Sequence, residues 1–136
     1  MDNFPNRGVG SELVSLTLPP LTLETLRAYA EVSGDNAQAH IDSQAARDMG
    51  FPDAFAHGLL SMAWLGRLLT DQIPVHMLKS YSVRFTAPVY VGEVLICSGL
   101  VTTSDVVDGH LRLEIDLKVA DDSGALKLAG KAVVAA

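Results

Sequence analysis

The most constraining feature of the sequence is an abrupt change of hydrophobic period near Pro74. Residues 58–73, GLLSMAWLGRLLTDQI, are apolar on nearly every side of a helix, and such a helix is expected to be buried. Pro74 is expected to end it. From residue 78 onward, apolar residues recur at every second position, as half-buried strands require. Such a chain is expected to wrap a sheet around one helix.

The alternation is clearest in residues 110–124, and the inward positions there are Leu111, Leu113, Ile115, Leu117 and Val119. Residues 78–93 alternate Tyr81, Val83 and Phe85 with polar neighbours, and residues 94–106 and 125–135 are also expected to form strands. The turn dipeptides between the strands are Gly92-Glu93, Asp108-Gly109 and Ser123-Gly124. These patterns predict a four-stranded antiparallel meander.

The first third of the chain contains weaker signals. Residues 1–11 are expected to be a loose polar arm, and residues 12–22 a short strand that Pro19-Pro20 stops. Thr22 is expected to cap a helix over residues 23–33, which Gly34 ends. A second, short helix over 44–49 would begin at Asp42 or Ser43 and end at Gly50.

Together these elements predict an α+β fold in which a curved antiparallel sheet wraps around a buried central helix. The 136 residues are expected to form a single domain. A sheet of this size leaves one edge and part of one face uncovered, and pairing two copies edge to edge would cover both. We therefore expect a dimer, most simply a homodimer.

Composition narrows the function. The formal net charge is −6, which argues against nucleic acid or an anionic membrane surface as the main partner. No stretch approaches the 18 uninterrupted apolar residues of a membrane span, and the polar N-terminus does not resemble a signal peptide. The single cysteine, Cys97, lies in an apolar run and is expected to be a buried structural thiol. A cytoplasmic location is expected.

The stretch SGDNAQAHID, residues 33–42, contains an acid and an imidazole five positions apart, Asp35 and His40. In a helix these side chains would be about 140° apart, and in a strand they would be on opposite faces. If they meet, the backbone between them has to be a shaped loop, and such loops often carry functional groups. Alternatively, Asp35 is a turn residue and His40 a surface or internally bonded histidine.

Three sequence blocks resemble the MaoC-like dehydratases, the (R)-specific enoyl-thioester hydratase group. Residues 29–46, YAEVSGDNAQAHIDSQAA, resemble the family signature aromatic–x–x–x–Ser–Gly/Glu–Asp–x–Asn–Pro–x–His–x–Asp. FAHGLLSMAWLGRLL resembles the start of the family's central helix, and VRFTAPVYVGE resembles its Phe–x–x–Pro–Val–x–x–Gly–Asp/Glu segment. The resemblance implies a hotdog fold, a dimer with a continuous sheet, and addition or removal of water at an acyl thioester, without a cofactor or a metal.

Carried onto this chain, the resemblance implies that Asp35 and His40 are the catalytic pair and that the backbone N–H of Gly58 contacts the thioester carbonyl. Hydration of an enoyl thioester needs a base for water, a proton for C2 and a donor to the carbonyl oxygen, and these groups can supply all three. The chain departs from the family pattern at three positions: Ala37 replaces Asn, Gln38 replaces Pro, and Gly66 replaces a serine found in some members.

Other residues are candidates for substrate binding. We expect Tyr29, Phe55, His57 and Trp64 to contact the substrate, although Trp64 could equally be a core residue and His57 could instead hold the loop by a side-chain hydrogen bond. Asp35, His40 and His57 match no common metal-ligand spacing, so no metal is expected. Four bases could meet a phosphate of coenzyme A or could simply be solvated: Arg47, Arg67, Lys79 and Arg84.

Two other functions compete with hydration. Hotdog thioesterases usually place a carboxylate in or beside the central helix, whereas this helix has no acid before Asp71. The third possibility is a non-catalytic acyl-binding module or heterodimer partner, which the departures at Ala37, Gln38 and Gly66 leave open. The prediction from sequence is a hydro-lyase that interconverts trans-2-enoyl and (R)-3-hydroxyacyl thioesters.

Overall fold

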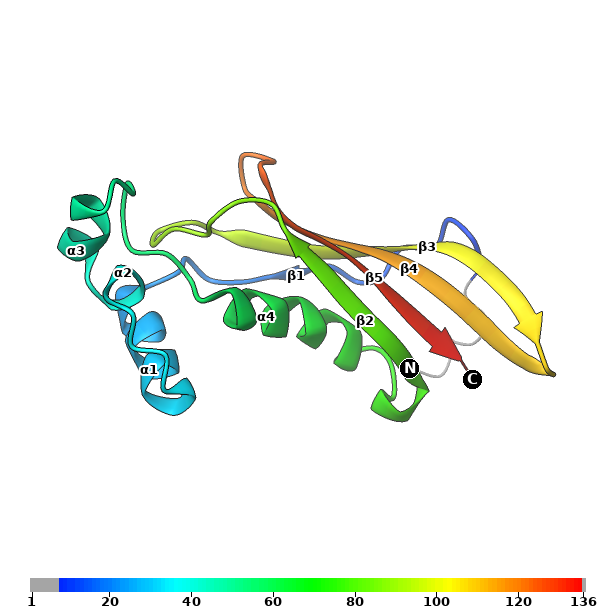
Figure 1. Cartoon of the computed structure of the whole chain (residues 1–136). Coiled ribbons are helices and arrows are strands. Elements are labelled where there is room, and N and C mark those ends of the chain that lie inside the picture. The colour runs from blue at the N-terminus through cyan, green and yellow to red at the C-terminus, as the bar shows by residue number, and fades with distance from the viewer. Residues whose placement is uncertain (1–7, 136) are drawn as a thin grey trace.

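A computed structural model describes residues 8–135 and shows one layer of sheet with helices on one side (Figure 1). The strands are β1 (Leu16–Thr17), β2 (Leu78–Phe85), β3 (Leu95–Val107), β4 (His110–Asp121) and β5 (Leu126–Ala135). The helices are α1 (Leu23–Ser33), α2 (Gln38–Ile41), α3 (Ser43–Asp48) and α4 (Gly58–Thr70), with a 3-10 turn at Val75–Met77. Within these residues, no helix has the length and apolar character needed to cross a membrane.

The sheet is antiparallel, and its strand order is β1-β3-β4-β5-β2. The predicted four-stranded meander is therefore wrong in one respect, because β2 pairs with β5 and not with β3. Alternation assigns side chains to faces of a sheet but does not choose a strand's neighbour. Residues 86–94 are also longer than the connection of a tight hairpin, and they cross from β2 to β3 at one end of the sheet (Figure 1).

The strand pattern itself is confirmed. On β4, Leu113, Ile115, Leu117 and Val119 are buried, while Asp116 and Lys118 are exposed. The β3–β4 turn has positive φ at Asp108 (51°) and Gly109 (78°), which is the geometry of a two-residue hairpin. Cys97 on β3 is fully buried, as expected, and burial raises the pKa of its thiol to about 11.

The edge of β3 is covered by the N-terminal segment. Leu16 and Thr17 of β1 pair with β3, and Gly10 N–H donates to Val101 O (2.9 Å) while Val101 N–H donates to Ser11 O (2.8 Å). Gly10 and Ser11, predicted to belong to a loose arm, are thus bonded to the sheet. Residues 1–7 of that arm lie outside the described residues.

Helix α4 packs against β2, β3 and β4 under the sheet (Figure 1). Its sheet-facing residues are buried, namely Leu60, Ser61, Leu65, Leu68 and Leu69. No described segment covers the opposite face, and Leu59 is 69% exposed. The expected burial on nearly every side therefore holds only toward the sheet in the single chain. The helix ends at Thr70, three residues earlier than predicted, because residues 71–73 turn toward Pro74.

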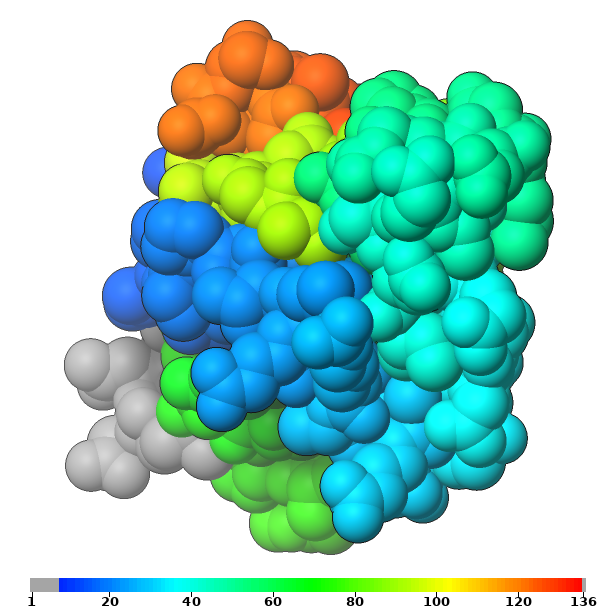
Figure 2. Space-filling view, turned by 90° about the vertical axis from the view of Figure 1, so that its left-hand side faces the viewer, coloured from blue at the N-terminus to red at the C-terminus, as the bar shows by residue number. Residues whose placement is uncertain are grey.

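The α1 and α3 helices begin at the caps that the sequence predicts, whereas α2 was not predicted and has no side-chain cap. Thr22 Oγ1 accepts from Thr25 N–H (3.1 Å), and Gly34 ends α1 in the left-handed conformation (φ 77°). Asp42 Oδ1 caps α3 by accepting from Gln44 and Ala45 N–H. Figure 2 shows these helices packed as a block beside the N-terminal segment and the 86–94 connection.

Candidate active site

Asp35 lies in a bent segment between α1 and α2. Its N–H donates to Ser33 Oγ (3.2 Å), and its Oδ1 accepts from Ala37 N–H (3.3 Å). Side-chain bonds of this kind stabilise a turn locally. The shaped loop expected between Asp35 and His40 is thus confirmed, with the difference that its second half is the one-turn helix α2.

His40 lies on α2 and is fixed by the segment before α4. Its Nδ1 is 2.8 Å from Phe55 O, and because a carbonyl only accepts, Nδ1 carries the proton. In the neutral imidazole, Nε2 then has a free lone pair. The Phe55 ring packs edge-on against the imidazole, with ring centroids 4.8 Å apart. The bond to Phe55 O thereby orients the ring and leaves Nε2 as the nitrogen available to act on a ligand.

His57 holds the loop, as one of the two interpretations from sequence expected. It is only 2% exposed, and its Nε2 donates to Asp35 O (3.0 Å). Its ring stacks on His40 and meets Tyr29 edge-on, with centroids 4.1 and 4.7 Å apart. The His57 ring therefore lies in contact with both Tyr29 and His40, and His57 and Tyr29 support the His40 ring by packing.

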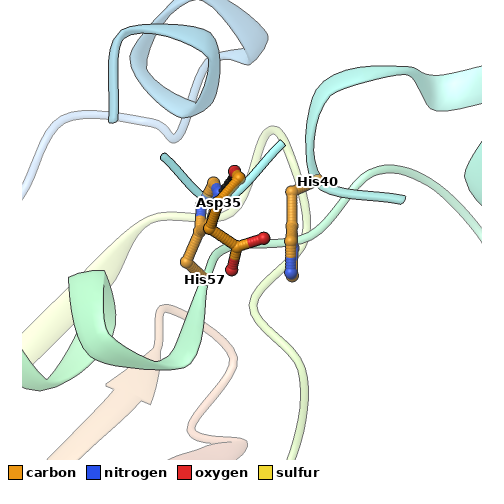
Figure 3. A group of neighbouring side chains, drawn as sticks. All are labelled: Asp35, His40 and His57. Atoms are coloured by element: carbon orange, nitrogen blue, oxygen red, sulfur yellow. Dashed lines mark hydrogen bonds between the residues drawn. The ribbon is translucent and has the colours of Figure 1, made fainter. Parts of the chain in front are cut away.

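The side chains of Asp35 and His40 lie close together, as the sequence analysis required for a catalytic pair. One ligand-type atom from each of Asp35, His40 and His57 lies within 4.8 Å of the other two, and in Figure 3 the Asp35 carboxylate is directed toward His40. A metal site has to be considered for such a group. However, the stacked rings are only 25° from parallel, so their in-plane lone pairs do not converge on an ion about 2 Å from both. The arrangement fits acid–base chemistry better than metal binding.

Gly58 begins α4 beside a pocket of about 350 Å³, which is lined by His40, Phe55, Ala56, Gly58, Ser61, Phe85, Thr86, Ala87, Pro88, Val89 and Leu128. No side chain caps the helix, and among the described residues the N–H groups of Gly58, Leu59 and Leu60 have no acceptor. These amides give the pocket a partial positive charge. His40 and Gly58, predicted from separate segments, therefore face the same cavity.

Phe85 forms one wall of the pocket. Phe85 alternates with polar neighbours in the same way as Tyr81 and Val83, but its side chain is 51% exposed. Its ring instead lies over Gly58, where an added Cβ would be 3.3 Å from the ring carbons. Since β2 is an edge strand, its terminal side chain can turn toward the helix and away from the core.

Lys127 supports the wall of the pocket that contains Thr86 and Pro88. The sequence did not indicate this role. Its side chain is buried, and its Nζ donates to Pro88 O (3.0 Å) and pairs with Glu93 (2.8 Å) and Asp121 (3.8 Å). Its carbonyl accepts from Thr86 N–H (2.9 Å). No local pattern signals this cluster, because Glu93 lies 34 positions away in the chain.

Several candidates are not brought to the pocket. Trp64 packs against the core and lines a different hollow, beside Pro19 and Pro20. Of the bases proposed for a phosphate, three are engaged with nearby groups: Arg47 with Asp53, Arg67 with Asp71, and Lys79 with His76 O. The geometry thus lends no support to substrate contact by Trp64.

A curved antiparallel sheet over one helix, with an acid–imidazole pair at that helix's N-terminus, defines a hotdog-fold protein with a candidate acyl-thioester site. The chain belongs to the MaoC-like domain family. The family model matches residues 10–121, most of the chain.

Two curated relatives are dehydratases by name. The chain is 31% identical over 112 residues to 3-hydroxyacyl-thioester dehydratase Z of Mycobacterium tuberculosis, covering 77% of this chain and 74% of that protein. It is 37% identical over 73 residues to the mitochondrial 3-hydroxyacyl-[acyl-carrier-protein] dehydratase of Arabidopsis thaliana. That match covers 54% of this chain and only 44% of the plant protein.

Solved structures confirm the hotdog fold expected from the resemblance. The (R)-hydratase from A. caviae involved in PHA biosynthesis is 25% identical, with a TM-score of 0.78 covering 94% of this chain and 96% of that one. An R-hydratase from Pseudomonas aeruginosa, unliganded, is also 25% identical. Its TM-score is 0.81, covering 94% of this chain and 81% of that one.

Proposed function

We propose that this protein is a hydro-lyase that adds water to trans-2-enoyl thioesters and removes it from (R)-3-hydroxyacyl thioesters. One observation carries the proposal: the Asp35 carboxylate lies next to His40, and His40 and Gly58 line the same pocket. The names of the dehydratase and (R)-hydratase relatives support it. The stereochemistry rests on the resemblance alone.

In the hydration direction, His40 Nε2 takes a proton from a water molecule while the water oxygen bonds to C3. The double-bond electrons move through C2 onto the carbonyl oxygen, giving an enolate. The imidazolium formed at His40 then returns the proton to C2. The net reaction adds one water molecule across the double bond. Asp35 accepts the second O–H of the water, and this hydrogen bond orients the water for attack.

The Gly58 N–H donates a hydrogen bond to the thioester carbonyl oxygen. Among residues 8–135 this N–H has no acceptor, and it lies at the positive end of α4, where negative charge is stabilised. A fixed donor at an enolate oxygen contributes roughly 10²–10³ in rate. The Phe85 ring lies so close to Gly58 that an added Cβ would be 3.3 Å from the ring carbons, so a glycine crowds this end of the pocket least.

The departures from the family pattern leave these contacts in place. Ala37 still donates its N–H to Asp35 Oδ1, and Gln38 begins α2, which carries His40. A Cβ at Gly66 would meet the Tyr81 ring, outside the pocket lining. The structure therefore favours an active enzyme over the non-catalytic acyl-binding or heterodimer alternative.

The proposal includes a homodimer in the cytoplasm and the acyl thioester of coenzyme A or a carrier protein as substrate, with no cofactor. The outer side of β2 pairs with no described strand, and the adjoining α4 face exposes Leu59. Pairing of two β2 strands across a two-fold axis would extend the sheet and cover this surface. The cytoplasmic location remains a prediction from the sequence.

The thioesterase alternative is weaker because the N-terminal half of α4 contains no carboxylate. Asp71 follows the far end of this helix, about 20 Å from Gly58 at 1.5 Å per residue. The deciding experiment incubates the purified protein with crotonyl-CoA and longer 2-enoyl-CoA esters. Loss of the enoyl absorbance without free thiol supports hydration, free thiol supports hydrolysis, and neither with any chain length supports a non-catalytic protein.

A further inference from the structure

A hydroxyl group lies in the same pocket and was not singled out from the sequence. Ser61 on α4 is 3% exposed and lines the pocket together with His40 and Gly58. Its N–H donates to His57 O (3.2 Å), but within residues 8–135 its Oγ has no hydrogen-bond partner. Among the described residues, the fully enclosed side-chain atom without a partner is His57 Nδ1, so the unpartnered Oγ of Ser61 remains accessible and can meet a ligand in the pocket.

The position of Ser61 on the helix indicates what its hydroxyl can reach. Residues three apart lie on the same face of a helix, and a helical side chain leans toward the turn before it. For Ser61, that turn contains Gly58, whose N–H also lacks an acceptor within the part of the chain that the structure describes. Both donors therefore border the same part of the pocket.

We propose that the Ser61 hydroxyl donates a second hydrogen bond to the thioester carbonyl oxygen, beside the Gly58 N–H. This inference rests on the proposed hydratase function and adds a substrate-contacting side chain to it. The bond strengthens as the oxygen becomes an enolate, so it stabilises the transition state more than the bound substrate. The structure thus assigns a catalytic role to the polar residue in an otherwise apolar stretch of α4.

The test compares Ser61→Ala and Ser61→Thr with wild type, and with Thr70→Ala, which removes an exposed hydroxyl from the same helix. We expect Ser61→Ala to lower kcat for crotonyl-CoA by roughly 10²-fold with little change in KM. Ser61→Thr should retain most of the rate and Thr70→Ala all of it. The melting temperature of Ser61→Ala should not fall, because no internal bond is lost.

A second readout is independent of turnover. Bound butyryl-CoA, labelled with ¹³C at its carbonyl, should show a lowered C=O stretching frequency in wild type and a smaller shift in Ser61→Ala. If wild type is active and Ser61→Ala shows the wild-type rate and the wild-type C=O frequency, this inference is overturned. The hydratase function would still stand. A wild type that does not hydrate enoyl thioesters would overturn both.

Discussion

The imidazole rings of His40 and His57 stack with their centroids 4.1 Å apart, and each ring is bonded to a backbone carbonyl. His40 donates to Phe55 O, while His57 donates to Asp35 O. The stack therefore ties the loop that carries the acid to the helix that carries the base. Since both acceptors are main-chain atoms, a side-chain substitution at position 35 or 55 leaves these acceptors in place.

Asp35→Asn and His40→Gln should each lower kcat by about 10²–10⁴-fold, because each removes a group that handles the water proton. Asp35→Asn is a clean test, since the carbonyl that accepts from His57 is retained. Steady-state hydration of crotonyl-CoA measures the effect, and circular dichroism checks the fold. Near-normal turnover in either folded variant would refute the assigned pair.

His57→Phe should reduce kcat by roughly 10-fold or more, because the ring contacts remain while the bond to Asp35 O is lost and the loop can shift. Tyr29→Phe is the matched control, since it keeps an edge-on ring against His57. Kinetics on folded variants measure the difference. If His57→Phe is as active as Tyr29→Phe, the hydrogen bond from His57 is dispensable and the ring acts only through packing.

Gly58→Ala should lower kcat by about 10-fold, because its Cβ would crowd the Phe85 ring and the carbonyl beside the amide. Phe85→Leu should make room, so the double variant should recover part of the loss. Phe85→Leu alone is the control. If the double variant is no faster than Gly58→Ala, crowding by this ring is not the cause.

Lys127→Met should lower the free energy of unfolding by about 1–3 kcal/mol, because Pro88 O loses its donor and the Glu93 and Asp121 carboxylates lose their cation. Lys131→Met, an exposed position on the same strand, is the control. Urea unfolding measures both. Lys127→Met should also raise KM, since Thr86 and Pro88 line the pocket. Equal stability losses in the two variants would contradict a special role for Lys127.

Acid stability should depend on Asp121. Hydrogen bonds from Ser123 Oγ and Ala125 N–H lower the pKa of its carboxyl to about 2. A lowered pKa stabilises the fold fully above the unfolded value near 3.9, and this contribution is lost as the pH falls through about 2. Asp121→Asn should therefore flatten the fall in urea midpoint between about pH 4 and pH 2. An unchanged slope would argue against the lowered pKa.

Local patterns predicted most of the fold, but they could not predict the neighbour of β2. The alternation on β4 depends on residues two apart, and helix caps such as Thr22 and Asp42 act within three residues. The path of residues 86–94 depends instead on distant partners, including Lys127 O for Thr86 and Ala54 O for Val91. The sequence pattern contains no record of such pairings.

The same distinction explains what was found at the site. Asp35, His40 and Gly58 stand out because they lie in unusual, motif-bearing segments. Ser61 does not, because a single hydroxyl in an apolar helix is common and only the cavity shows where it points. Trp64, in contrast, stands out in the sequence as the single tryptophan but lines a hollow away from the candidate site.

Phe85 is the last residue of the edge strand β2, so the wall over the reacting amide belongs to a border of the sheet whose outer side pairs with no described strand. In the proposed homodimer, the second copy would dock along this same border. Dilution that separates the two copies would then leave Phe85 unsupported and the cavity open to bulk water. Specific activity would accordingly become concentration-dependent at the point where the copies dissociate.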